Sequence, residues 1–320
     1  MSNVNDGTGH LVVALGGNAI TRQQDTGAIP EQFTNTRESL APIADLIAAG
    51  RNVVLTHGNG PQVGNYLIRV ERARDEVPYL PLPIIVADLQ GGMGYMISQV
   101  LQGLLAAREA YRPVTTVLTQ VLIDADDPSL ADPDKYVGPF YEEAEAKALA
   151  EQRGWMVKKD SNRGWRRVVP SPRPLEIVEA GIIRGLIEQN AVVVAAGGGG
   201  IPVRRIEGGF LEGVDGVIDK DRASAVLGLD IGATDLLILT SVPHVSLWFG
   251  TAQQRDLDHL TSHEARRYME QGHFPAGSMG PKIEAALTFL EGGGERVFIG
   301  SVDRTGDILA GRTGTCLTKS

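Results

Sequence analysis

The sequence predicts an α/β protein, a three-layer α/β/α sandwich with a mainly parallel central sheet. Three observations favour this fold. Short apolar runs without polar alternation recur along the chain, which is typical of strands buried on both faces. Segments with helical spacing separate these runs, as in right-handed strand–helix–strand crossovers. Tight groups of glycines follow several of the runs, where a buried strand would turn into a helix.

Length and composition limit the class of protein. The chain has 320 residues and a formal net charge of −9, with 42% hydrophobic and 22% charged residues, which excludes global disorder. The acidic balance argues against a general nucleic-acid binder. A single cysteine, Cys316, excludes an internal disulfide and a cysteine zinc cluster. Because residues 1–10 lack an apolar signal core and no run approaches the roughly 20 residues that span a bilayer, we expect a cytoplasmic protein without a membrane partner.

The apolar runs and helical segments give the predicted elements in order. The strands are predicted at Leu11–Leu15, Val53–Leu55, Val117–Leu118, Val192–Ala196, Leu236–Leu239 and Val297–Ile299. The helices are predicted at Glu38–Ala49, Met93–Glu109, Leu175–Gln189, Arg222–Leu227, Ser262–Gln271 and Lys282–Leu290. Pro61 is suited to the first position of one further helix.

Residues 123–174 interrupt this alternation, because they are rich in Asp, Pro and Arg. They contain a short acidic helix (Tyr141–Arg153) and two strand-like runs, Trp155–Lys159 and Gly164–Val169, around a polar turn at residues 160–163. We expect a protruding helix-plus-hairpin subdomain, since long excursions from a compact domain usually bind or cover something. A change in composition near residue 212 predicts an N-terminal lobe (1–212, including the subdomain) and a C-terminal lobe (213–320).

Three glycine-rich turns follow predicted strands and therefore meet at the carboxyl edge of the sheet, where α/β folds bind ligands. They are Gly16-Gly17-Asn18, residues 56–61 (which include Gly58, Asn59 and Gly60) and Gly197–Gly200. Any one of them could serve only to turn the chain. Three on one edge favour a small-anion or phosphate site, with Asn18 and Asn59 as amide donors. None matches a P-loop or a G-x-G-x-x-G fingerprint, and His57 is more readily explained by a structural hydrogen bond than by catalysis.

Three lysines are candidates for binding the same anion. Lys282 falls in the first turn of a predicted helix, where a cation opposes the helix dipole unless an anion is bound there. Lys220 lies between Asp219 and Asp221, one of which could orient the ammonium while the other caps the helix. Lys135 lies on the excursion, and its neighbours in the sequence alone predict an ordinary lysine in a loop. Glycine amides and lysines suit phosphoryl transfer, which mainly needs positioning and positive charge. Metal-ligand spacings and a Gly-x-Ser-x-Gly nucleophile are absent from the sequence, so no protein metal site is predicted.

The chain resembles the carbamate kinases of the amino-acid-kinase superfamily over nearly its whole length. The segments that carry the resemblance are Val12–Ile20, Thr56–Asn65, Lys135–Phe140, Arg163–Pro172, Gly197–Val203, Val217–Asp221 and Phe274–Ala286. The stretches Gly-Asn-Gly-Pro-Gln-Val-Gly-Asn (58–65) and Gly-Ser-Met-Gly-Pro-Lys-Ile-Glu-Ala-Ala (277–286) are the most specific.

The resemblance implies a homodimer that transfers a phosphoryl group reversibly between ATP and carbamate, with Mg²⁺ as cofactor. It implies catalytic roles for Lys135, Lys220, Lys282 and Asp219, with Asp219 organising the lysines. The substrate-binding residues it implies are Gly16, Gly17, Asn18, Gly58, Asn59 and Gly60, to which we add Gly199 and Gly200 of the third turn. The nucleotide-binding residues expected are Lys220, Thr240, Ser241, Met279 and Lys282. Ala14 stands where many superfamily relatives place a catalytic lysine, and Lys135 is expected to replace it.

The segment Thr240–His244 departs from the family pattern, which has an acidic residue at the position of Pro243 and an aromatic residue at the position of His244. The departure affects the contacts expected with the adenine and ribose of the nucleotide. Two alternatives stay open: a superfamily kinase for a different small carboxylate, and a regulator that binds nucleotide or carbamoyl phosphate without turnover. The same site would serve arginine or purine catabolism and carbamoyl phosphate synthesis, so the sequence does not set the direction.

Overall fold

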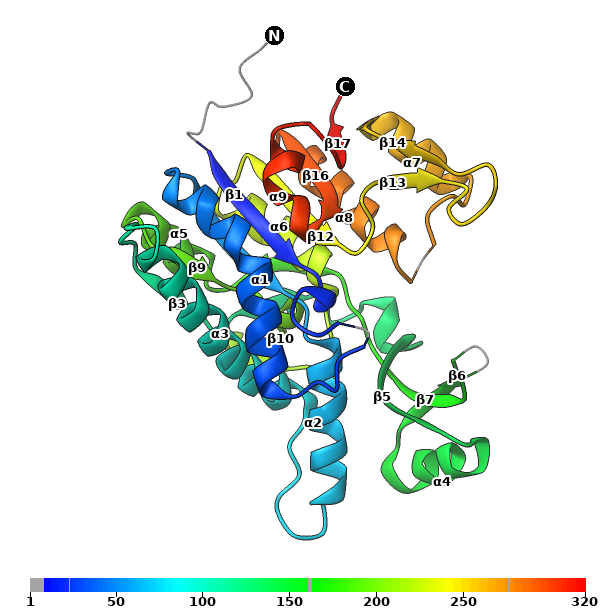
Figure 1. Cartoon of the computed structure of the whole chain (residues 1–320). Helices are drawn as coiled ribbons and strands as arrows, with labels where there is room; N and C mark the ends of the chain where they lie inside the picture. The colour runs from blue at the N-terminus through cyan, green and yellow to red at the C-terminus, as the bar shows by residue number, and fades with distance from the viewer. Residues whose placement is uncertain (1–8, 23, 161–162, 276) are drawn as a thin grey trace.

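A computed structural model describes residues 9–22, 24–160, 163–275 and 277–320. Its centre is an eight-stranded sheet with the order β15-β17-β16-β12-β1-β2-β9-β3 (Figure 1). The strands are β1 (His10–Leu15), β2 (Asn52–His57), β3 (Val114–Thr116), β9 (Val192–Val194), β12 (Asp235–Thr240), β15 (His259–Thr261), β16 (Arg296–Ser301) and β17 (Thr315–Thr318). The sheet is parallel from β16 to β3, and β17 runs antiparallel to β16.

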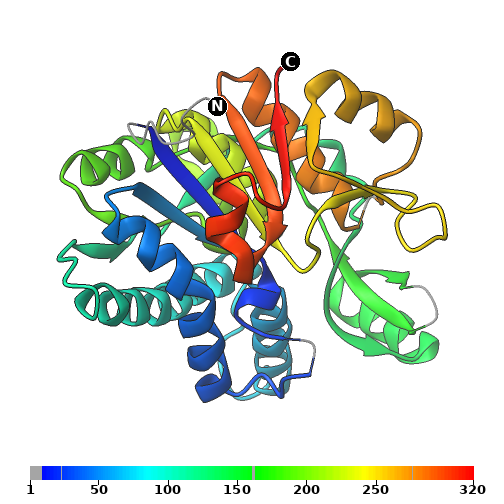
Figure 2. The same ribbon diagram turned by 45° about the horizontal axis from the view of Figure 1, so that its top comes forward.

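Helices cover both faces of this sheet, as Figures 1 and 2 show. Leu11 and Val13 of β1 pack in a core with α1 (Ile29–Ala48) and α3 (Leu82–Ala106). Val12 and Ala14 face the opposite core, which contains α5 (Ala180–Glu188), α6 (Lys220–Asp230), α7 (Ser262–Glu270) and α8 (Met279–Glu291). Because successive residues of a strand point to opposite faces, one apolar run supplies both cores. The predicted three-layer α/β/α sandwich is confirmed.

The excursion forms a subdomain that projects from the body beside α2 (Gly60–Arg72), drawn in green at the lower right of Figure 1. It contains the predicted helix as α4 (Glu143–Arg153) and the predicted hairpin as β6 (Met156–Lys159) and β7 (Trp165–Val169). Residues 161–162 of the predicted turn lie outside the described residues. A third strand, β5 (Lys135–Tyr141), pairs antiparallel with β7 and was not predicted.

Several predicted boundaries were wrong. The segment Leu175–Gln189 divides into β8 (Pro174–Ile177) and α5, and Val117–Leu118 is not a strand but joins β3 to β4 (Gln120–Ile123). Leu118 is 53% exposed, so this apolar pair does not mark a buried strand. Helices α1 and α3 begin nine and eleven residues earlier than predicted (29 against 38, and 82 against 93), and both carry a proline in the first turn.

Smaller elements complete the fold. A second sheet has the order β11 (Leu211–Gly213), β10 (Ile201–Arg205), β4, β8. A hairpin joins β13 (Val245–Leu247) to β14 (Arg255–Leu257). The short helices are α9 (Thr305–Leu309) and the 3-10 turns η1 (Gly17–Ala19), η2 (Pro128–Leu130), η3 (Gly197–Gly199), η4 (Glu207–Gly209) and η5 (Val302–Arg304). The lobe division at residue 212 stays a prediction.

In the part of the chain that the structure describes, no helix is long and apolar enough to cross a membrane.

Candidate functional site

The carboxyl ends of the central parallel strands meet at one edge of the sheet and place the predicted turns together. Strand β1 leads into Gly16 and Gly17, and the neighbouring β2 leads into Gly58. These two turns touch, because a Cβ on Gly58 would lie 3.3 Å from the backbone nitrogen of Gly17. A Cβ on Gly16 would lie 2.9 Å from the carbonyl oxygen of Leu239 on β12. Glycine at these positions therefore allows three strand ends to approach closely.

The third turn lies against the second one. Gly198 has φ +67°, and a Cβ there would lie 2.0 Å from Nδ2 of Asn59. Gly199 and Gly200, both predicted to bind substrate, pack instead behind this turn: added Cβ atoms would lie 2.1 Å from the carbonyl oxygen of Ile218 and 2.3 Å from the side chain of Val121. Of this turn, Gly198 is the residue that reaches the cavity described next.

Three cavities lie in a row along this edge of the sheet. We call the first the Asn59 cavity; it has about 310 Å³ and is lined by Gly17, Gly58, Asn59, Gly60, Pro61, Val63, Lys135, Tyr136, Val137, Arg166, Gly198, Val217, Ile218, Asp219 and Lys220. The central cavity has about 350 Å³ and is lined by Gly16, Gly17, Asn18, Ala19, Lys220, Leu239, Thr240, Ser241, Lys282, Ser301 and Val302. The Met279 cavity has about 300 Å³ and is lined by Thr240, Ser241, Val242, His244, Ser246, Phe249, His273, Pro275, Ser278, Met279 and Lys282.

Two lysines stand at the junctions of this row. Lys220 lines both the Asn59 cavity and the central cavity, and Lys282 lines both the central cavity and the Met279 cavity. Both side chains are mostly buried, with 12% and 16% exposed. Lys220 starts α6 and Lys282 lies in the first turn of α8, so each ammonium is held at the N-terminus of a helix. A ligand that spans the row would meet both charges.

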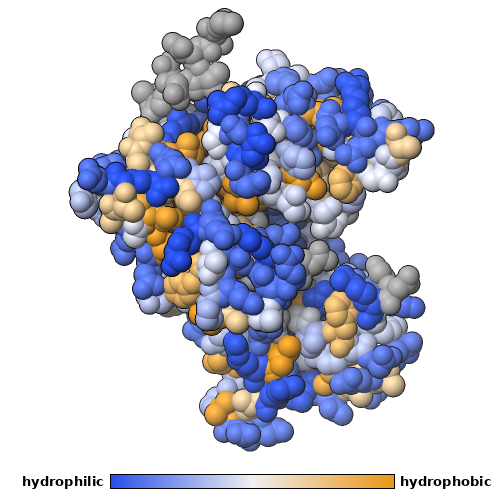
Figure 3. Space-filling model, in the orientation of Figure 1, coloured by the Kyte–Doolittle hydropathy of each residue, from blue (hydrophilic) through white to orange (hydrophobic). Residues whose placement is uncertain are grey.

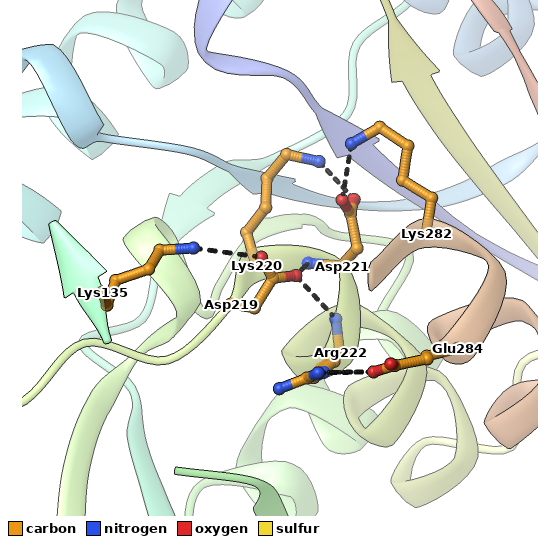
Figure 4. Close-up of polar contacts among 7 residues, drawn as sticks. All are labelled: Lys135, Asp219, Lys220, Asp221, Arg222, Lys282 and Glu284. Carbon is orange, nitrogen blue, oxygen red and sulfur yellow. Dashed lines mark hydrogen bonds and ion pairs between the residues drawn. The ribbon is translucent and has the colours of Figure 1, made fainter. Parts of the chain in front are cut away.

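Asp221 joins the two lysines. Lys220 donates to its Oδ1, and Lys282 donates to its Oδ2 at 2.9 Å, as Figure 4 shows. The carboxylate is nearly inaccessible, with 3% of its side chain exposed. Burial alone would raise the pKa of Asp221, but the charges of Lys220 and Lys282 together with their hydrogen bonds hold the pKa below its ordinary value. Asp221 is thus an ionised carboxylate that fixes both ammonium groups.

Asp219 was predicted to organise the three lysines, but in the structure it contacts one of them, Lys135, and caps a helix. Its Oδ1 accepts hydrogen bonds from the backbone nitrogens of Asp221 (3.0 Å) and Arg222 (3.4 Å), so it caps α6. Its Oδ2 lies 3.5 Å from Nζ of Lys135, which reaches across from β5 of the subdomain (Figure 4). Asp219 therefore contacts Lys135, while the pairing of Lys220 with Lys282 is made by Asp221. The sequence had left open which carboxylate caps the helix and which orients the lysine.

Arg166 and Ser301 are two of the cavity residues that were not among the predicted site residues. Arg166 donates to the carbonyl oxygen of Gly138 at 2.9 Å and to Asp160 at 3.1 Å, so its guanidinium is held at the wall of the Asn59 cavity. Ser301 ends β16 in the central cavity. Arg166 belongs to the segment Arg163–Pro172 that carried the family resemblance, which was a usable signal. A serine after an apolar run carries no comparable signal.

Asn59 places a buried amide at the wall of the Asn59 cavity. The residue is 7% exposed, and its Nδ2 has no hydrogen-bond partner in the described part of the chain. It precedes the first residue of α2 without capping that helix through its side chain. A buried amide donor without a partner is costly, of the order of 1–3 kcal/mol, unless a ligand accepts from it. The N-terminus of α2 and this amide together suit an anion.

His57 lies directly beneath these turns and is fully enclosed, with 1% exposed. Burial, with a further contribution from the charge of Lys220, lowers the pKa of His57 to about 4. The imidazole is therefore neutral at pH 7. Its Nδ1 lies 3.1 Å from the carbonyl oxygen of Gly58, and a Cβ on Gly197 would lie 2.5 Å from its Nε2. This is the structural hydrogen bond that the sequence favoured over catalysis.

The Met279 cavity contains the segment that departs from the family pattern. Three of the predicted nucleotide-binding residues, Thr240, Ser241 and Met279, line this cavity. Phe249 and His273 add aromatic surface to its wall. His244 also lines it, and its Nε2 accepts a hydrogen bond from the backbone nitrogen of Gly314 at 3.1 Å. His244, which stands where the family has an aromatic residue, is thus hydrogen-bonded to the residue that precedes β17.

The carboxylates of the site are compatible with a cation that is held mainly by a nucleotide. Among the described residues there is no group of three or more His, Cys, Asp or Glu side chains arranged to hold a metal. Asp221 is engaged by two lysines, and Oδ1 of Asp219 by two backbone amides. Mg²⁺ commonly binds through one carboxylate or two and the substrate phosphates, retaining several waters. Oδ2 of Asp219, which faces the Lys135 ammonium at 3.5 Å, is the carboxylate oxygen of these two residues that would be left to such an ion.

The space-filling view in Figure 3 shows the molecular surface notched between the projecting subdomain and the body above it. A wider cavity of about 630 Å³ is also lined by Lys135, Tyr136 and Asp219, together with Arg222. The Lys135–Asp219 contact therefore borders both this cavity and the Asn59 cavity.

Comparisons with known proteins identify the family. The family model described as "Amino acid kinase family" matches residues 10–301. A carbamate kinase of Pyrococcus furiosus is 46% identical over 307 residues, covering 95% of this chain and 98% of the relative. A carbamate kinase-like protein of Escherichia coli is 44% identical over 313 residues, covering 97% of this chain and 99% of the relative. The structure of a carbamate kinase from Giardia lamblia bound to AMP-PNP matches with a TM-score of 0.92 and 40% identity, covering 98% of this chain and 99% of that one.

Proposed function

Because this chain belongs to the amino acid kinase family and matches carbamate kinases over nearly its full length, we propose that it is a carbamate kinase. The reaction is the reversible transfer of a phosphoryl group between ATP and carbamate, giving ADP and carbamoyl phosphate. The observation that carries the proposal is the row of three cavities with Lys220 and Lys282 at its two junctions. An acceptor, a transferred phosphoryl group and a nucleoside need such a row.

We assign the Asn59 cavity to carbamate or the carbamoyl group. The backbone amides around Gly17 and Gly58, the buried amide of Asn59 and the ammonium of Lys135 supply donors to a small anion. The lining of this cavity contains a single arginine, Arg166, which is already bonded to Gly138 and Asp160. A longer acid with a second charged group would lack a free partner here. This favours carbamate over the carboxylates that other kinases of the superfamily use.

We assign the Met279 cavity to the nucleoside and the central cavity to the phosphates. The nucleotide analogue in the Giardia relative supports a nucleotide site in a chain of this shape. Thr240, Ser241 and Met279 would contact the nucleoside side, and Lys282 the phosphates that follow.

In the direction of ATP synthesis, an oxygen of the β-phosphate of ADP attacks the phosphorus of carbamoyl phosphate. The new O–P bond forms as the bond from phosphorus to the carbamoyl oxygen breaks, and carbamate leaves with the electron pair. Lys220, at the junction between acceptor and phosphate cavities, stabilises the transferring group. Lys135 and Lys282 act on its two sides. Because carbamate is already an anion at neutral pH, the reverse attack needs no dedicated base.

We propose Mg²⁺ as the cofactor, held by nucleotide phosphates and by Oδ2 of Asp219. When bound, it neutralises negative charge on the phosphates.

We also propose that the chain forms a homodimer. Large apolar side chains are exposed on or beside the second sheet, including Leu175 (55%), Ile182 (66%) and Phe210 (71%). Light scattering at micromolar concentration tests this: a mass of twice 34.2 kDa is expected.

The activity test mixes the protein with ADP, Mg²⁺ and carbamoyl phosphate, and follows ATP with luciferase. A reaction without enzyme is required because carbamoyl phosphate decomposes in water. We expect rapid ATP formation that is absent with acetyl phosphate, and a loss of the order of 10²-fold or more in Lys220→Ala with the fold retained. ATP formed equally well from acetyl phosphate would favour a different carboxylate kinase. Nucleotide binding without turnover would favour a regulator.

A further inference from the structure

The strand next to the one that carries Lys135 is joined to the segment that carries Asp219 and Lys220. Lys135 of β5 stands opposite Val169 of β7 in the antiparallel register. The next residue, Pro170, accepts a hydrogen bond through its carbonyl oxygen from the backbone nitrogen of Val217 at 3.0 Å. The chain then reaches Asp219 two residues later. The position of Lys135 relative to Asp219 is thus set by one strand pairing and one backbone hydrogen bond.

An ion pair reinforces this junction. Nη2 of Arg167, on β7, lies 2.6 Å from Oδ2 of Asp215. The arginine side chain is 8% exposed, whereas the aspartate is 53% exposed. The other oxygen of Asp215 accepts from the backbone nitrogen of Leu82 at 3.2 Å, where α3 begins. The pair therefore ties β7, the segment before α6 and the start of α3 to one another.

The pair is also protected from water on the subdomain side. The guanidinium carbon of Arg167 lies 5.1 Å from the centre of the Trp155 ring. Weaker solvent screening increases the strength of a charge pair relative to an exposed one. By contrast, the ion pair of Lys158 with Asp132 in the same subdomain is exposed on both sides (40% and 84%). The Arg167–Asp215 pair is therefore suited to fixing a position.

We propose that Arg167 and Asp215 are positioning residues for the phosphoryl transfer, acting through Lys135. This inference rests on the proposed function. Neither residue needs to touch substrate: the pair holds the end of β7 against residues 215–217 and so keeps the Lys135 ammonium at the Asn59 cavity. Lys135 is itself 44% exposed and lies 3.5 Å from Asp219, so its reach depends on where its strand is held. A misplacement of about 1 Å can cost roughly 10²-fold in rate.

The test is a double-mutant cycle on the full chain. Arg167→Met keeps much of the stem volume and removes the charge, leaving a half-exposed aspartate that water can solvate. We expect kcat for ATP formation to fall by roughly 10- to 100-fold with the KM for ADP nearly unchanged. In a Lys135→Met background the same change should lower kcat less than twofold further, because the group it positions is gone. Arg167→Lys should recover part of the loss.

A second readout does not depend on activity. Hydrogen exchange of the peptide that contains Val217 should be faster in Arg167→Met than in the wild type, since its amide bonds to Pro170. Asp215→Asn should give the same exchange result. Lys158→Met, which breaks the exposed pair on β6, is the matched control and should leave both kcat and the Val217 exchange rate unchanged.

The outcomes separate this inference from the proposed function. If the wild type makes no ATP, the proposed function fails, and the exchange rate at Val217 alone decides whether Arg167 holds the junction. If the wild type is active, an Arg167→Met kcat within twofold of it overturns the inference. An equal loss of kcat with and without Lys135 also overturns it, since Arg167 would then act on the protein in general.

Discussion

Nζ of Lys282 lies 2.9 Å from Oδ2 of Asp221, whose other oxygen accepts from Lys220. The two lysines come from the starts of α6 and α8, helices that are adjacent in the same layer. One buried carboxylate therefore fixes two cations that helix dipoles oppose. The cations are held in place before a substrate binds, which is the preorganisation that electrostatic catalysis requires.

Asp221→Asn should weaken both folding and activity. The substitution keeps the shape of the side chain but leaves two buried ammonium groups without a counter-charge. Breaking a buried pair in this way costs about 3–5 kcal/mol, because an uncompensated charge remains. We expect a lower midpoint in urea unfolding at pH 7 and a fall in kcat of the order of 10²-fold.

Asp307→Asn is the matched control for this change. Asp307 also accepts from two cations, Arg304 and Arg312, but both arginines are more than half exposed. Because water screens these pairs, Asp307→Asn should barely move the unfolding midpoint and should leave kcat unchanged. Equal effects of the two substitutions would contradict the role given to Asp221.

Asn59→Asp should impair binding of carbamoyl phosphate more than binding of ADP. The new carboxylate would stand in the Asn59 cavity, where we place the small anion, and would repel it. We expect the KM for carbamoyl phosphate to rise at least about 10-fold, since one unfavourable charge contact costs more than 1.4 kcal/mol at short range. Steady-state kinetics with each substrate varied in turn measures the change.

Asn190→Asp provides the control for charge alone. Asn190 is exposed and precedes β9, so it lies near the opposite, amino-terminal edge of the sheet. Its substitution alters the net charge by the same amount without facing the cavities. A similar rise in KM from both variants would mean that the effect is not local to Asn59.

The sequence was sufficient for the parts of the fold that depend on local pattern. Val12 and Ala14 alternate with Leu11 and Val13 between two cores, and an uninterrupted apolar run predicts such a strand. Strand β5 was missed because Lys135–Phe140 contains a glycine and a proline, and its register with β7 breaks between Val137 and Tyr141. The residues with which it pairs lie 24 to 34 residues further along the chain, which no local pattern reveals.

In the candidate site, too, the features that depend on local pattern were predicted and those that depend on distant contacts were not. Turns that follow strands could be placed on one edge by topology, so Gly17 and Gly58 were found from sequence. Asp221 was recognised only as one of two possible caps, because the partner that decides its role, Lys282, is 61 residues away. Gly199 and Gly200 show the converse: their positive φ and close contacts explain glycine there through packing against Ile218 and Val121.

Gly198→Ala should affect substrate binding beyond its effect on the backbone. The residue has φ +67°, where an alanine is strained by roughly 1–2 kcal/mol, and the added Cβ would lie 2.0 Å from Nδ2 of Asn59. The amide of Asn59 must therefore move. We expect lower stability together with a raised KM for carbamoyl phosphate.

Gly209→Ala separates strain from displacement. Gly209 has φ +79° and nothing within 4 Å of an added Cβ, so it carries a similar backbone cost without the clash. Its urea midpoint should fall by no more than that of Gly198→Ala, and its KM should not change. If Gly198→Ala keeps the wild-type KM while losing stability, Asn59 does not contact the substrate.

The buried imidazole of His57 should make stability depend on pH between 6.5 and 4. Its pKa is lowered from 6.5 to about 4, mainly by burial, so between these values the unfolded chain binds a proton that the folded chain does not. The stabilisation is therefore fully present above pH 6.5 and is lost as the pH falls toward 4. At about 1.4 kcal/mol per unit, the loss is of the order of 3 kcal/mol.

Urea unfolding of the wild type and of His57→Gln at several pH values between 7.5 and 4.5 measures this dependence. The wild type should lose more stability than the variant as the pH falls, and the difference between them isolates His57 from other groups such as His10, whose pKa burial also lowers. His263→Gln, an exposed histidine on α7, should follow the wild-type curve. Parallel curves for the wild type and His57→Gln would mean that His57 keeps its ordinary pKa in the folded protein and is protonated there below about pH 6.5. A cation would then lie beneath the glycine turns beside Lys220, and the anion-binding charge of the site would have to include it.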